Sequence, residues 1–382
     1  MEAKTGSSYT TSCLAEVAAI DRFGRTVIRV KAVVLCAGEG TRMRPFSYSQ
    51  PKHLLPIANR PVIEWILETI SFAGISEIAV VVSPSTESAF REALGDGRSL
   101  GVSLSYVVQE TARGLAHAVA CAESYVSGEA FLLYLGDNLF ERGVQGLVDV
   151  FEEDRCSAAI SLVSVEDPRR FGVASVEDGK IAQLVEKPEH PPSNLAIAGG
   201  YVFGPVIFDA IRQIKPSARG ELEITDAIQK LISDGRRVVP HEVGGWWKDV
   251  GQPRDMITAN ELLVALREPS VEGRIDGGSV IEGHVEVSRD AMIEASTIRG
   301  PAVIGSGTEV RNAVVGPNVS VGDGCVIEDC RIEQSIVMER ARVSGVDGLG
   351  WSIVGRGAEL RRRGARELVS VLLGDQCAAR LL

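Results

Sequence analysis

The sequence lacks several features, and each absence excludes a class of protein. No apolar run approaches the length of a membrane span, and the N-terminus has no hydrophobic stretch of the signal-peptide kind. Basic residues are not in surplus: the formal net charge is −11 at pH 7, which argues against a general nucleic-acid binder. We therefore expect a cytoplasmic protein that binds neither a membrane nor a nucleic acid.

Clustered cysteines are also missing. The seven Cys are scattered, Cys325 and Cys330 form the only near pair, and no His lies close enough in sequence to complete a zinc site. This pattern predicts buried free thiols in a reducing compartment.

The chain does contain enough apolar residues for more than one core. Its 382 residues exceed the usual length of one domain, and 45% of them are hydrophobic. Between Lys31 and Leu263, short apolar segments alternate with segments of helical period, which predicts a Rossmann-like, mostly parallel sheet covered on both faces. Strands are expected at Ala32–Leu35, Ile78–Val82, Leu104–Val108, Phe131–Leu135 and Ala158–Val165, and helices at Val62–Phe72, Ser85–Leu94 and Leu115–Tyr125. Gly172–Val185, with Asp178-Gly179 at its centre, predicts an antiparallel hairpin.

A different rhythm begins after Glu268. Aliphatic residues recur about every six positions, which is wrong for a helix and fits the stacked short strands of a left-handed parallel β-helix. A loose all-β domain is the alternative. The inward residues would be Ile281, Val287, Ile293, Ile304, Val310, Val315, Val321, Ile327, Val343, Val354 and Leu360. We expect four parts: an extension at 1–30, an α/β domain at 31–263, a linker at 264–274 and the β-helix at 275–382.

A Gly-rich turn follows the first expected strand. Gly38 and Gly40 there would let backbone N–H groups approach phosphate oxygens. The spacing matches neither GxGxxG nor GxxxxGK[ST], which argues against a dinucleotide site and a Walker-type ATPase. Arg42 and Lys52 add two cations, so the segment predicts a phosphate-binding site.

Two carboxylates are candidates for the same site. Asp137 follows the strand expected at Phe131–Leu135, at the edge of the sheet where open α/β sheets bind ligands. Asp249 lies between Trp247 and Gly251, far along the chain. Each could instead serve a turn or a helix cap.

Taken together, these segments resemble the sugar-phosphate nucleotidylyltransferases. The likeness is carried by Ala37-Gly38-Glu39-Gly40-Thr41-Arg42 and Pro51-Lys52-His53-Leu54-Leu55-Pro56. It is strongest to glucose-1-phosphate thymidylyltransferases of a long form that ends in a β-helix. It covers residues 31–259 and the six-residue repeats but leaves out residues 1–30.

The resemblance implies transfer of a nucleoside monophosphate from dTTP or UTP to glucose 1-phosphate, with release of pyrophosphate. Arg42 and Lys52 would hold the triphosphate, and Asp137 and Asp249 would share a Mg²⁺ ion, which commonly takes two protein carboxylates. Gln109 would bind a pyrimidine, because its amide offers a donor and an acceptor to an imide edge. The other nucleotide-binding residues implied are Ala37, Gly38, Gly40, Thr41 and Gly114.

Other segments would bind the sugar phosphate. The resemblance assigns the sugar hydroxyls to Glu186, the sugar phosphate to Lys187, which would also take part in catalysis, and the pocket lining to Gly172 and Tyr201. The chain departs from the family's common pattern at Phe171 and at Ala198-Gly199-Gly200, which leaves the identity of the hexose open. Glu221 and Glu223 could equally be structural charges that open a helix.

Three rival functions remain. The chain could be a uridylyl- or guanylyltransferase for another sugar; Gln109 favours a pyrimidine but does not separate dTTP from UTP. The β-helix could transfer acetyl groups, although His284 is its only His. A regulatory subunit is disfavoured because the expected cations and carboxylates are all present. We expect the β-helix to hold a homo-oligomer together.

Overall fold

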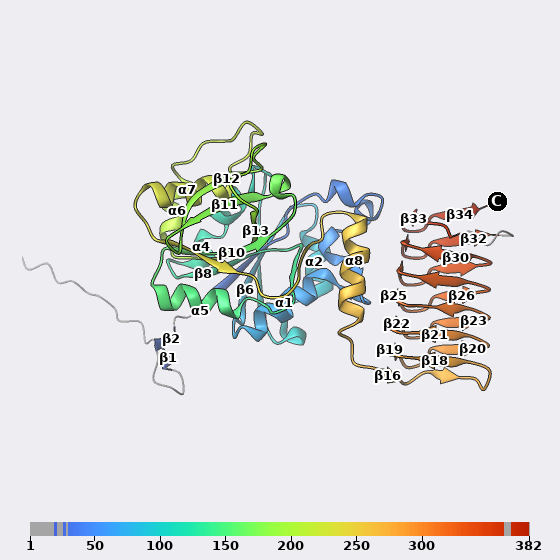
Figure 1. Cartoon of the computed structure of the whole chain (residues 1–382). Helices are drawn as coiled ribbons and strands as arrows, with labels where there is room; N and C mark the ends of the chain where they lie inside the picture. Colours follow the sequence, from blue (N-terminus) through green and yellow to red (C-terminus); the bar gives the residue numbers. More distant parts are fainter. Residues whose placement is uncertain (1–18, 21–25, 28–29, 363–367, 382) are drawn as a thin grey trace, which may run out of the picture.

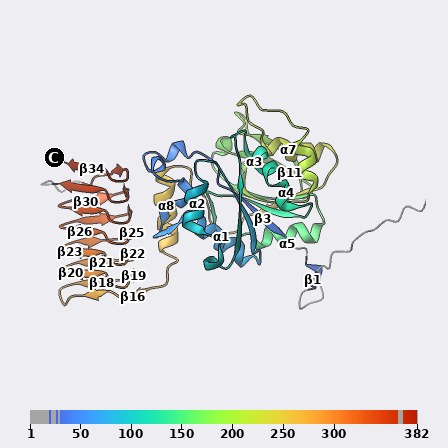
Figure 2. The same cartoon turned by 180° about the vertical axis from the view of Figure 1, so that it is seen from behind.

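The computed structural model describes residues 19–20, 26–27, 30–362 and 368–381. An α/β lobe and a prism of stacked strands lie side by side, with helix α8 (Pro253–Val264) between them, in both views of the molecule (Figures 1 and 2). An extension is expected at residues 1–30. Of these residues, the structure describes β1 (Ala19–Ile20) and β2 (Thr26–Val27), which pair antiparallel, and Val30. No helix in the described ranges has the length and apolar character needed to cross a membrane.

A nine-stranded mixed sheet forms the centre of the α/β lobe, in the order β12-β11-β13-β8-β3-β6-β7, with β10 joined to β13 and β14 joined to β10. Strands β8, β3, β6 and β7 run parallel, and β13 runs antiparallel to β8. The carboxyl ends of the parallel strands therefore meet at one edge of the sheet. The strands are β3 (Lys31–Leu35), β6 (Glu77–Val82), β7 (Ser103–Val108), β8 (Phe131–Leu135), β10 (Ala158–Ser164), β11 (Gly172–Glu177), β12 (Lys180–Glu186), β13 (Leu195–Phe203) and β14 (Val238–Glu242).

Helices cover both faces of this sheet. Successive residues of β3 alternate between two buried clusters, Ala32 and Val34 facing one and Val33 and Leu35 the other, as the two-residue period of a strand requires. The first face is covered by α1 (Val62–Phe72), α2 (Glu87–Leu94), α5 (Gln145–Asp154) and α8; the second is covered by α3 (Leu115–Cys121), α4 (Glu123–Val126), α6 (Val206–Ile211) and α7 (Ile224–Ser233). The predicted α/β fold class is confirmed.

The predicted hairpin is present, and one predicted helix is interrupted. Strands β11 and β12 pair antiparallel around Asp178 and Gly179, which both have positive φ, as a tight hairpin turn requires. The helix expected at Leu115–Tyr125 divides into α3 and α4, because Ala122 leaves the helical conformation with φ −91° and ψ 2°.

The C-terminal part is the expected β-helix, built from three parallel sheets. The register advances by 17 residues a turn in most coils, as from Val287 to Ile304 and from Val310 to Ile327. The first sheet contains β16 (Ser270–Val271), β19 (Val285–Val287), β22 (Ala302–Ile304), β25 (Val319–Val321), β28 (Ile336–Val337), β31 (Ile353–Val354) and β33 (Leu372–Leu373). The second contains β17 (Arg274–Ile275), β20 (Met292–Glu294), β23 (Glu309–Arg311), β26 (Val326–Glu328), β29 (Arg342–Ser344), β32 (Glu359–Arg362) and β34 (Ala378–Leu381). The third contains β18 (Val280–Glu282), β21 (Thr297–Arg299), β24 (Val314–Val315), β27 (Arg331–Glu333) and β30 (Asp347–Gly350). Strand β16 lies within residues 264–274, which were expected to form the linker, so the first strand of the prism comes before residue 275.

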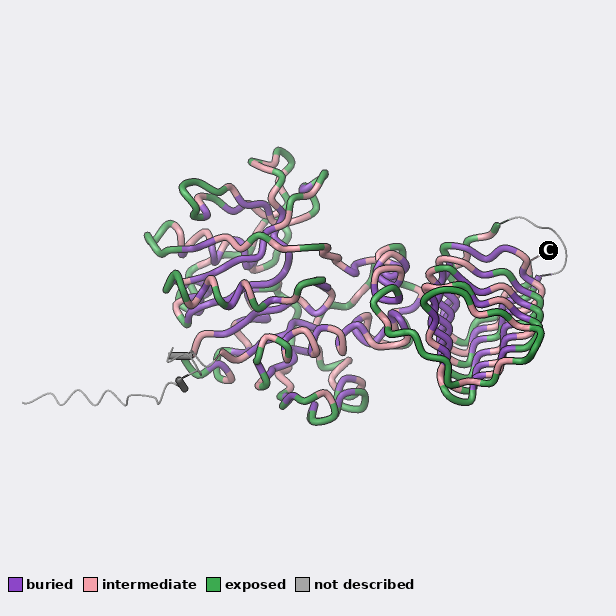
Figure 3. The backbone as a smooth tube through the Cα atoms, turned by 60° about the horizontal axis from the view of Figure 1, so that its bottom comes forward, coloured by how far each residue is buried: buried purple, intermediate pink, exposed green. Residues whose placement is uncertain are grey.

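Buried residues recur in the coils along the prism (Figure 3), and its interior cluster consists of aliphatic residues and two cysteines. Of the residues expected to point inward, all but the half-buried Ile281 are fully buried. The interior also holds the thiols of Cys325 and Cys330, which donate to backbone carbonyls. The six described cysteines are free, but Cys377 is exposed and Cys121 half-buried, so burial was wrongly expected for these two. Cys13 lies outside the described residues.

The first sheet of the prism faces α8 and the α/β lobe. Its outward residues Val303, Ile336 and Ile353 are almost fully buried and belong to the same cluster as Phe46 of the lobe. Outward positions of the second sheet instead carry charges that reach solvent, among them Arg311 paired with Glu294. Because Val303, Ile336 and Ile353 are buried in the lobe's own cluster, one face of the prism is committed to the lobe.

Candidate active site

Strand register brings the two predicted carboxylates together. Short strand β9 (Asn138–Phe140) follows Asp137 and pairs antiparallel with β15 (Trp247–Asp249), so that Asp249 lies opposite Asn138. The amide of Val250 donates to the carbonyl of Asp137 over 2.8 Å. The two acids are therefore neighbours although 111 residues separate them in sequence.

A glycine lets this corner form close to the Gly-rich turn. The amide of Gly136 donates to the carbonyl of Leu35, which ends β3. A Cβ at Gly136 would lie 2.5 Å from the Sγ of Cys36 and 2.7 Å from the Leu35 carbonyl oxygen, so any side chain there would push the strand ends apart. The close approach places Asp137 beside the residues that follow β3.

Both predicted cations meet the carboxylates. The 3₁₀ turns η1 (Thr41–Met43) and η3 (Lys52–Leu54) follow β3, and the Lys52 ammonium pairs with the Asp137 carboxylate. At Gly251, a Cβ would lie 3.3 Å from Nη2 of Arg42 and 3.4 Å from Oδ2 of Asp249, so these two charged groups flank the same glycine. Two acids and two cations thus come from four segments.

The electrostatics of this cluster are uneven. Burial would raise the pKa of Asp137, but Lys52 outweighs it, with help from a 2.8 Å hydrogen bond from Asn138, and holds that pKa below its usual value. Burial, and then the charge of Asp137, raises the pKa of Asp249 to about 6. Buried His53 stays neutral at pH 7, because burial and then Lys52 lower its pKa to about 3.

The predicted base-binding residues form a second group. Gln109 is buried at the end of β7, where its Nε2 lies 3.4 Å from the carbonyl of Gly114 and 2.9 Å from Nδ1 of His117. Gly114 has φ 103°, and a Cβ there would lie 2.5 Å from the carbonyl oxygen of Leu222, so the position requires glycine. The loop is also hydrogen-bonded to Leu222 in both directions, through the Arg113 carbonyl and the Ala116 amide.

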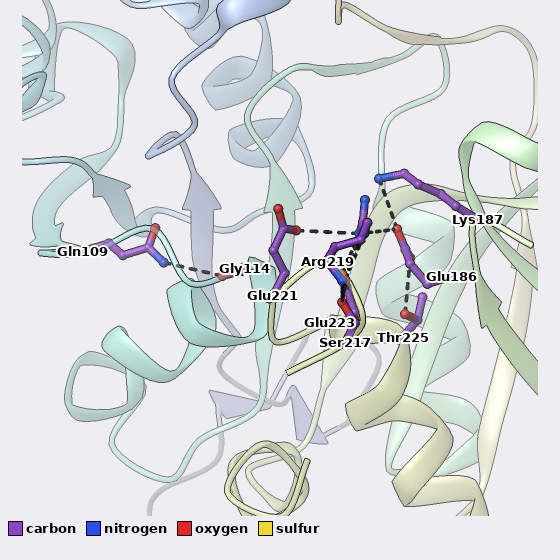
Figure 4. A network of polar contacts seen from close by, with 9 residues as sticks. All are labelled: Gln109, Gly114, Glu186, Lys187, Ser217, Arg219, Glu221, Glu223 and Thr225. Atoms are coloured by element: carbon purple, nitrogen blue, oxygen red, sulfur yellow. Dashed lines mark hydrogen bonds and ion pairs between the residues drawn. The ribbon is translucent and has the colours of Figure 1, made fainter. Parts of the chain in front are cut away.

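Two of the predicted sugar residues, Glu186 and Lys187, lie at the end of the hairpin, where Glu186 meets the segment before α7 (Figure 4). Gly172 pairs directly with Glu186, and Lys187 forms an ion pair with Glu186 at 3.3 Å. Glu186 also accepts a hydrogen bond from Thr225 Oγ1 at 3.2 Å. Tyr201 is buried near Glu186; burial and then that charge raise the pKa of its hydroxyl.

Arg219, for which the sequence predicted no role, is the centre of this group. Its Nη2 lies 3.2 Å from Glu186, 2.9 Å from Glu223 and 3.6 Å from Glu221. Glu223 is only 2% exposed and also accepts from Ser217 Oγ at 2.7 Å, so it is an anchor for Arg219. A signal was available, since this cation stands two residues before the acidic motif that begins at Glu221.

Trp247 links the two ends of the site. Its Nε1 lies 2.8 Å from both the Asn138 side-chain oxygen and the Ala198 carbonyl, and its ring meets the edge of Phe171 at a centroid distance of 5.5 Å. Phe171 directly precedes Gly172. The site is therefore continuous from the paired acids to the hairpin, and the sequence had named Trp247 without a role.

Comparison with known proteins shows the family of the chain. The nucleotidyl transferase family matches residues 31–265. Glucose-1-phosphate thymidylyltransferase of Streptomyces antibioticus is 41% identical over 87% of this chain and 93% of that protein. The low-salt glycan biosynthesis nucleotidyltransferase Agl11 of Haloferax volcanii is 42% identical over 87% of this chain and 94% of that protein. The crystal structure of UDP-glucose pyrophosphorylase complexed with UDP-glucose has a TM-score of 0.57 and 27% identity, and covers 63% of this chain and 100% of that one. The chain belongs to the nucleotidyl transferase family.

Proposed function

We propose that the protein transfers a nucleoside monophosphate from dTTP or UTP to glucose 1-phosphate, giving a nucleoside diphosphate glucose and pyrophosphate. The observation that carries the proposal is the meeting of Asp137 and Asp249 with Lys52 and Arg42 beside the Gly-rich turn. With a divalent cation on the two acids, such a cluster would bind a triphosphate by electrostatic attraction, without a protein nucleophile. The names of the relatives supply the substrate classes.

Asp137 and Asp249 would hold Mg²⁺. Burial, and then the charge of Asp137, raises the pKa of Asp249, and a divalent cation between the two carboxylates would offset both effects. The described residues contain no group of three or more His, Cys, Asp or Glu that could form a metal cage, and a two-carboxylate site fits Mg²⁺, which keeps water and phosphate ligands. When bound, the ion would withdraw charge from phosphate oxygens.

The reaction needs little proton chemistry from the protein. An oxygen of the sugar 1-phosphate, already ionised at pH 7, attacks the α-phosphorus and forms the new P–O bond. The bond from that phosphorus to the bridging oxygen of the β-phosphate breaks, and pyrophosphate leaves with the electron pair. Arg42 would bind the leaving phosphates in bidentate fashion, and Lys52 would add a point charge. The backbone from Ala37 to Thr41 would cradle the same phosphates.

The nucleotide base would bind against Gln109 and Gly114. His117 Nδ1 and the Gly114 carbonyl both lie within hydrogen-bond distance of Gln109 Nε2, so the Gln109 amide is held in one orientation. A side-chain amide matches the imide edge that thymine and uracil share. This contact supports a pyrimidine and leaves dTTP and UTP equally possible.

The sugar phosphate would bind between the hairpin and the segment before α7. Glu186 would accept from sugar hydroxyls, Lys187 and Arg219 would face the phosphate, and Gly172 and Tyr201 would bound the pocket. Arg219 is well suited to this because three carboxylates hold it and it is still 41% exposed.

We also propose a homo-oligomer held by the β-helix. One prism face is occupied by the lobe, so the two other faces and the ends are the surfaces available to further copies. Sedimentation or native mass measurement of the full chain would test this, with a single protomer as the contrary result.

A substrate matrix tests the proposed function. Pyrophosphate release should require both a pyrimidine triphosphate and a hexose 1-phosphate, with glucose 1-phosphate as the best acceptor. An added arm with acetyl-CoA and amino-sugar phosphates should show no consumption, since the β-helix has one His, His284, which is exposed. Release with GTP but with neither dTTP nor UTP would contradict the assignment of Gln109.

A further inference from the structure

The segment between the Gly-rich turn and Lys52 is the starting point. We call residues 45–50, which include the 3₁₀ turn η2 (Phe46–Tyr48), the connecting segment. Within it, Ser47 Oγ donates to the carbonyl of Gly40 over 2.7 Å. Gly40 in turn faces Lys52, since a Cβ there would lie 3.3 Å from Lys52 Cβ. The place of the connecting segment therefore sets the place of both phosphate-binding elements.

The last coil of the β-helix touches this segment directly. Asp375, in the turn between β33 and β34, accepts a hydrogen bond on Oδ2 from Ser49 Oγ at 2.5 Å. Beside it, a Cβ on the buried Gly374 would lie 3.1 Å from Pro45 Cβ. Both contacts join residues more than 300 positions apart, and neither belongs to the substrate-binding set.

The Asp375 carboxylate is fixed from its own side. Its Oδ1 accepts from the amide of Arg356 in the preceding coil at 2.8 Å. The Arg356 side chain pairs with Glu339 at 2.7 Å and reaches Gln50 Oε1 of the connecting segment at 3.4 Å. Asp375 is therefore an anchored acceptor rather than a free surface group.

A buried contact keeps the prism from shifting against the lobe. Asn260 on α8 has no exposed surface, and its Oδ1 accepts from the amide of Ala58 at 2.9 Å and from Ser320 Oγ of β25 at 2.7 Å. Asn59 adds a 2.7 Å hydrogen bond to the carbonyl of Val321. With the shared apolar cluster, these contacts make the β-helix a rigid support for this edge of the lobe.

We propose that Asp375 is a positioning residue for nucleotidyl transfer. Through Ser49 it holds the connecting segment, and through Ser47 and Gly40 that segment holds the Gly-rich turn and Lys52 where the triphosphate binds. Asp375 touches no reacting atom. The inference rests on the proposed function, and it gives the β-helix a role in the chemistry of its own protomer.

The chain offers a matched control for testing Asp375. Asp323 fills the corresponding turn of an earlier coil, where its Oδ1 accepts from the amide of Ser306 at 2.7 Å. The structure gives the Asp323 carboxylate no hydrogen bond or ion pair to a described residue of the lobe. Asp375→Ala and Asp323→Ala therefore lose the same bond within the β-helix, and only the first also loses Ser49.

The experiment measures steady-state kinetics and equilibrium triphosphate binding of full-length variants. Asp375→Ala should raise KM and Kd for the triphosphate about three- to tenfold, the size expected for one lost hydrogen bond, and leave KM for the sugar phosphate unchanged. Ser49→Ala should do the same from the other side, and the double variant should be no worse than either single. Asp375→Asn should keep the wild-type values, because its side-chain amide can still form hydrogen bonds with both the Arg356 amide and Ser49 Oγ.

Asp323→Ala should match the wild type in both KM values although it lowers the melting temperature, as Asp375→Ala also should. If Asp375→Ala behaves like Asp323→Ala, or raises both KM values equally, the positioning role is wrong. If the wild type binds dTTP but transfers no nucleotide, the proposed function is wrong. The effect of Asp375 on triphosphate binding is then still measured by Kd.

Discussion

The two ends of the site are built by different means. At the phosphate end, Asp137 and Asp249 meet because β9 and β15 pair in one register, so the backbone fixes the chemistry. At the sugar end, Glu186, Arg219 and Glu223 meet through ion pairs between side chains. The first arrangement is rigid before any ligand arrives. The second can exchange its partners when a ligand with its own charge and hydroxyls enters.

The largest effect should come from breaking the phosphate end. Asp137→Ala and Arg42→Ala should each lower kcat/KM about 10²- to 10³-fold, because each removes charge from the place where charge develops. Circular dichroism should show an intact fold. Turnover near that of the wild type in either variant would remove that residue from the chemistry.

Breaking the sugar end should change affinity more than turnover. Arg219→Ala should raise KM for the sugar 1-phosphate about 10- to 100-fold, the effect of a lost charge-assisted contact, and leave KM for the triphosphate within about twofold. It should also destabilise the fold by about 1–3 kcal/mol, because Glu223 stays buried without its cation.

Arg219→Lys is the control for that change. It keeps a cation near Glu223 and loses the two-pronged geometry, so stability should recover further than KM. If Arg219→Ala raises KM equally for the sugar 1-phosphate and for the triphosphate, Arg219 has a structural role only.

The raised pKa of Asp249 predicts that the stability of the metal-free protein depends on pH. The pKa of Asp249 is about 6 when folded and has an ordinary value of 3.8. The raised folded pKa favours the folded state while the acid is protonated, so this contribution is present below about pH 4 and lost as pH rises to about 6, by about 1–3 kcal/mol. Asp249→Asn should remove that loss and be more stable than wild type at pH 7 by the same amount.

Urea unfolding of the two metal-free proteins at pH 4 and pH 7 measures this difference. The quantity to compare is the difference in unfolding free energy between wild type and variant at each pH. This difference removes the contribution of Asp137, whose lowered pKa changes stability with pH in the opposite direction. A variant less stable than the wild type at pH 7 would show that Asp249 is stabilised by its neighbours rather than strained.

The smallest effect is expected where the base binds. Gln109→Leu should raise KM for dTTP and UTP about three- to tenfold, since an amide pair with the base is lost, and leave the sugar 1-phosphate unaffected. His117→Ala should produce a weaker form of the same change because it only releases the amide. A change in the sugar KM alone would place the base elsewhere.

The same contrast explains what the sequence could predict. The β-helix was predictable because aliphatic residues recur about every six positions in its sequence. The sheet was predictable because short apolar segments alternate with segments of helical period. The phosphate end was within reach because Gly40, Lys52 and Asp137 lie in short motifs attached to strand ends. Arg219 was missed because an ion-pair network leaves no period in the sequence, and its place two residues before the acidic motif at Glu221 does not by itself identify its partners.

The contact between Asp375 and Ser49 was likewise out of reach. It depends on how two separately folded parts pack, and nothing near either residue signals the other. The break at Ala122 was missed for a similar reason, because the apolar pattern continues across it while the backbone turns.

Asp137, joined to Asp249 by strand register, is proposed as the centre of the nucleotidyl transfer site. The most direct measurement is pyrophosphate release from dTTP and glucose 1-phosphate with Mg²⁺, by the wild type and by Asp137→Asn. The wild type should release pyrophosphate only when both substrates are present, and the variant should be slower by about 10²-fold or more. Equal rates in the two proteins, or no release by the wild type with dTTP or UTP, would contradict this assignment.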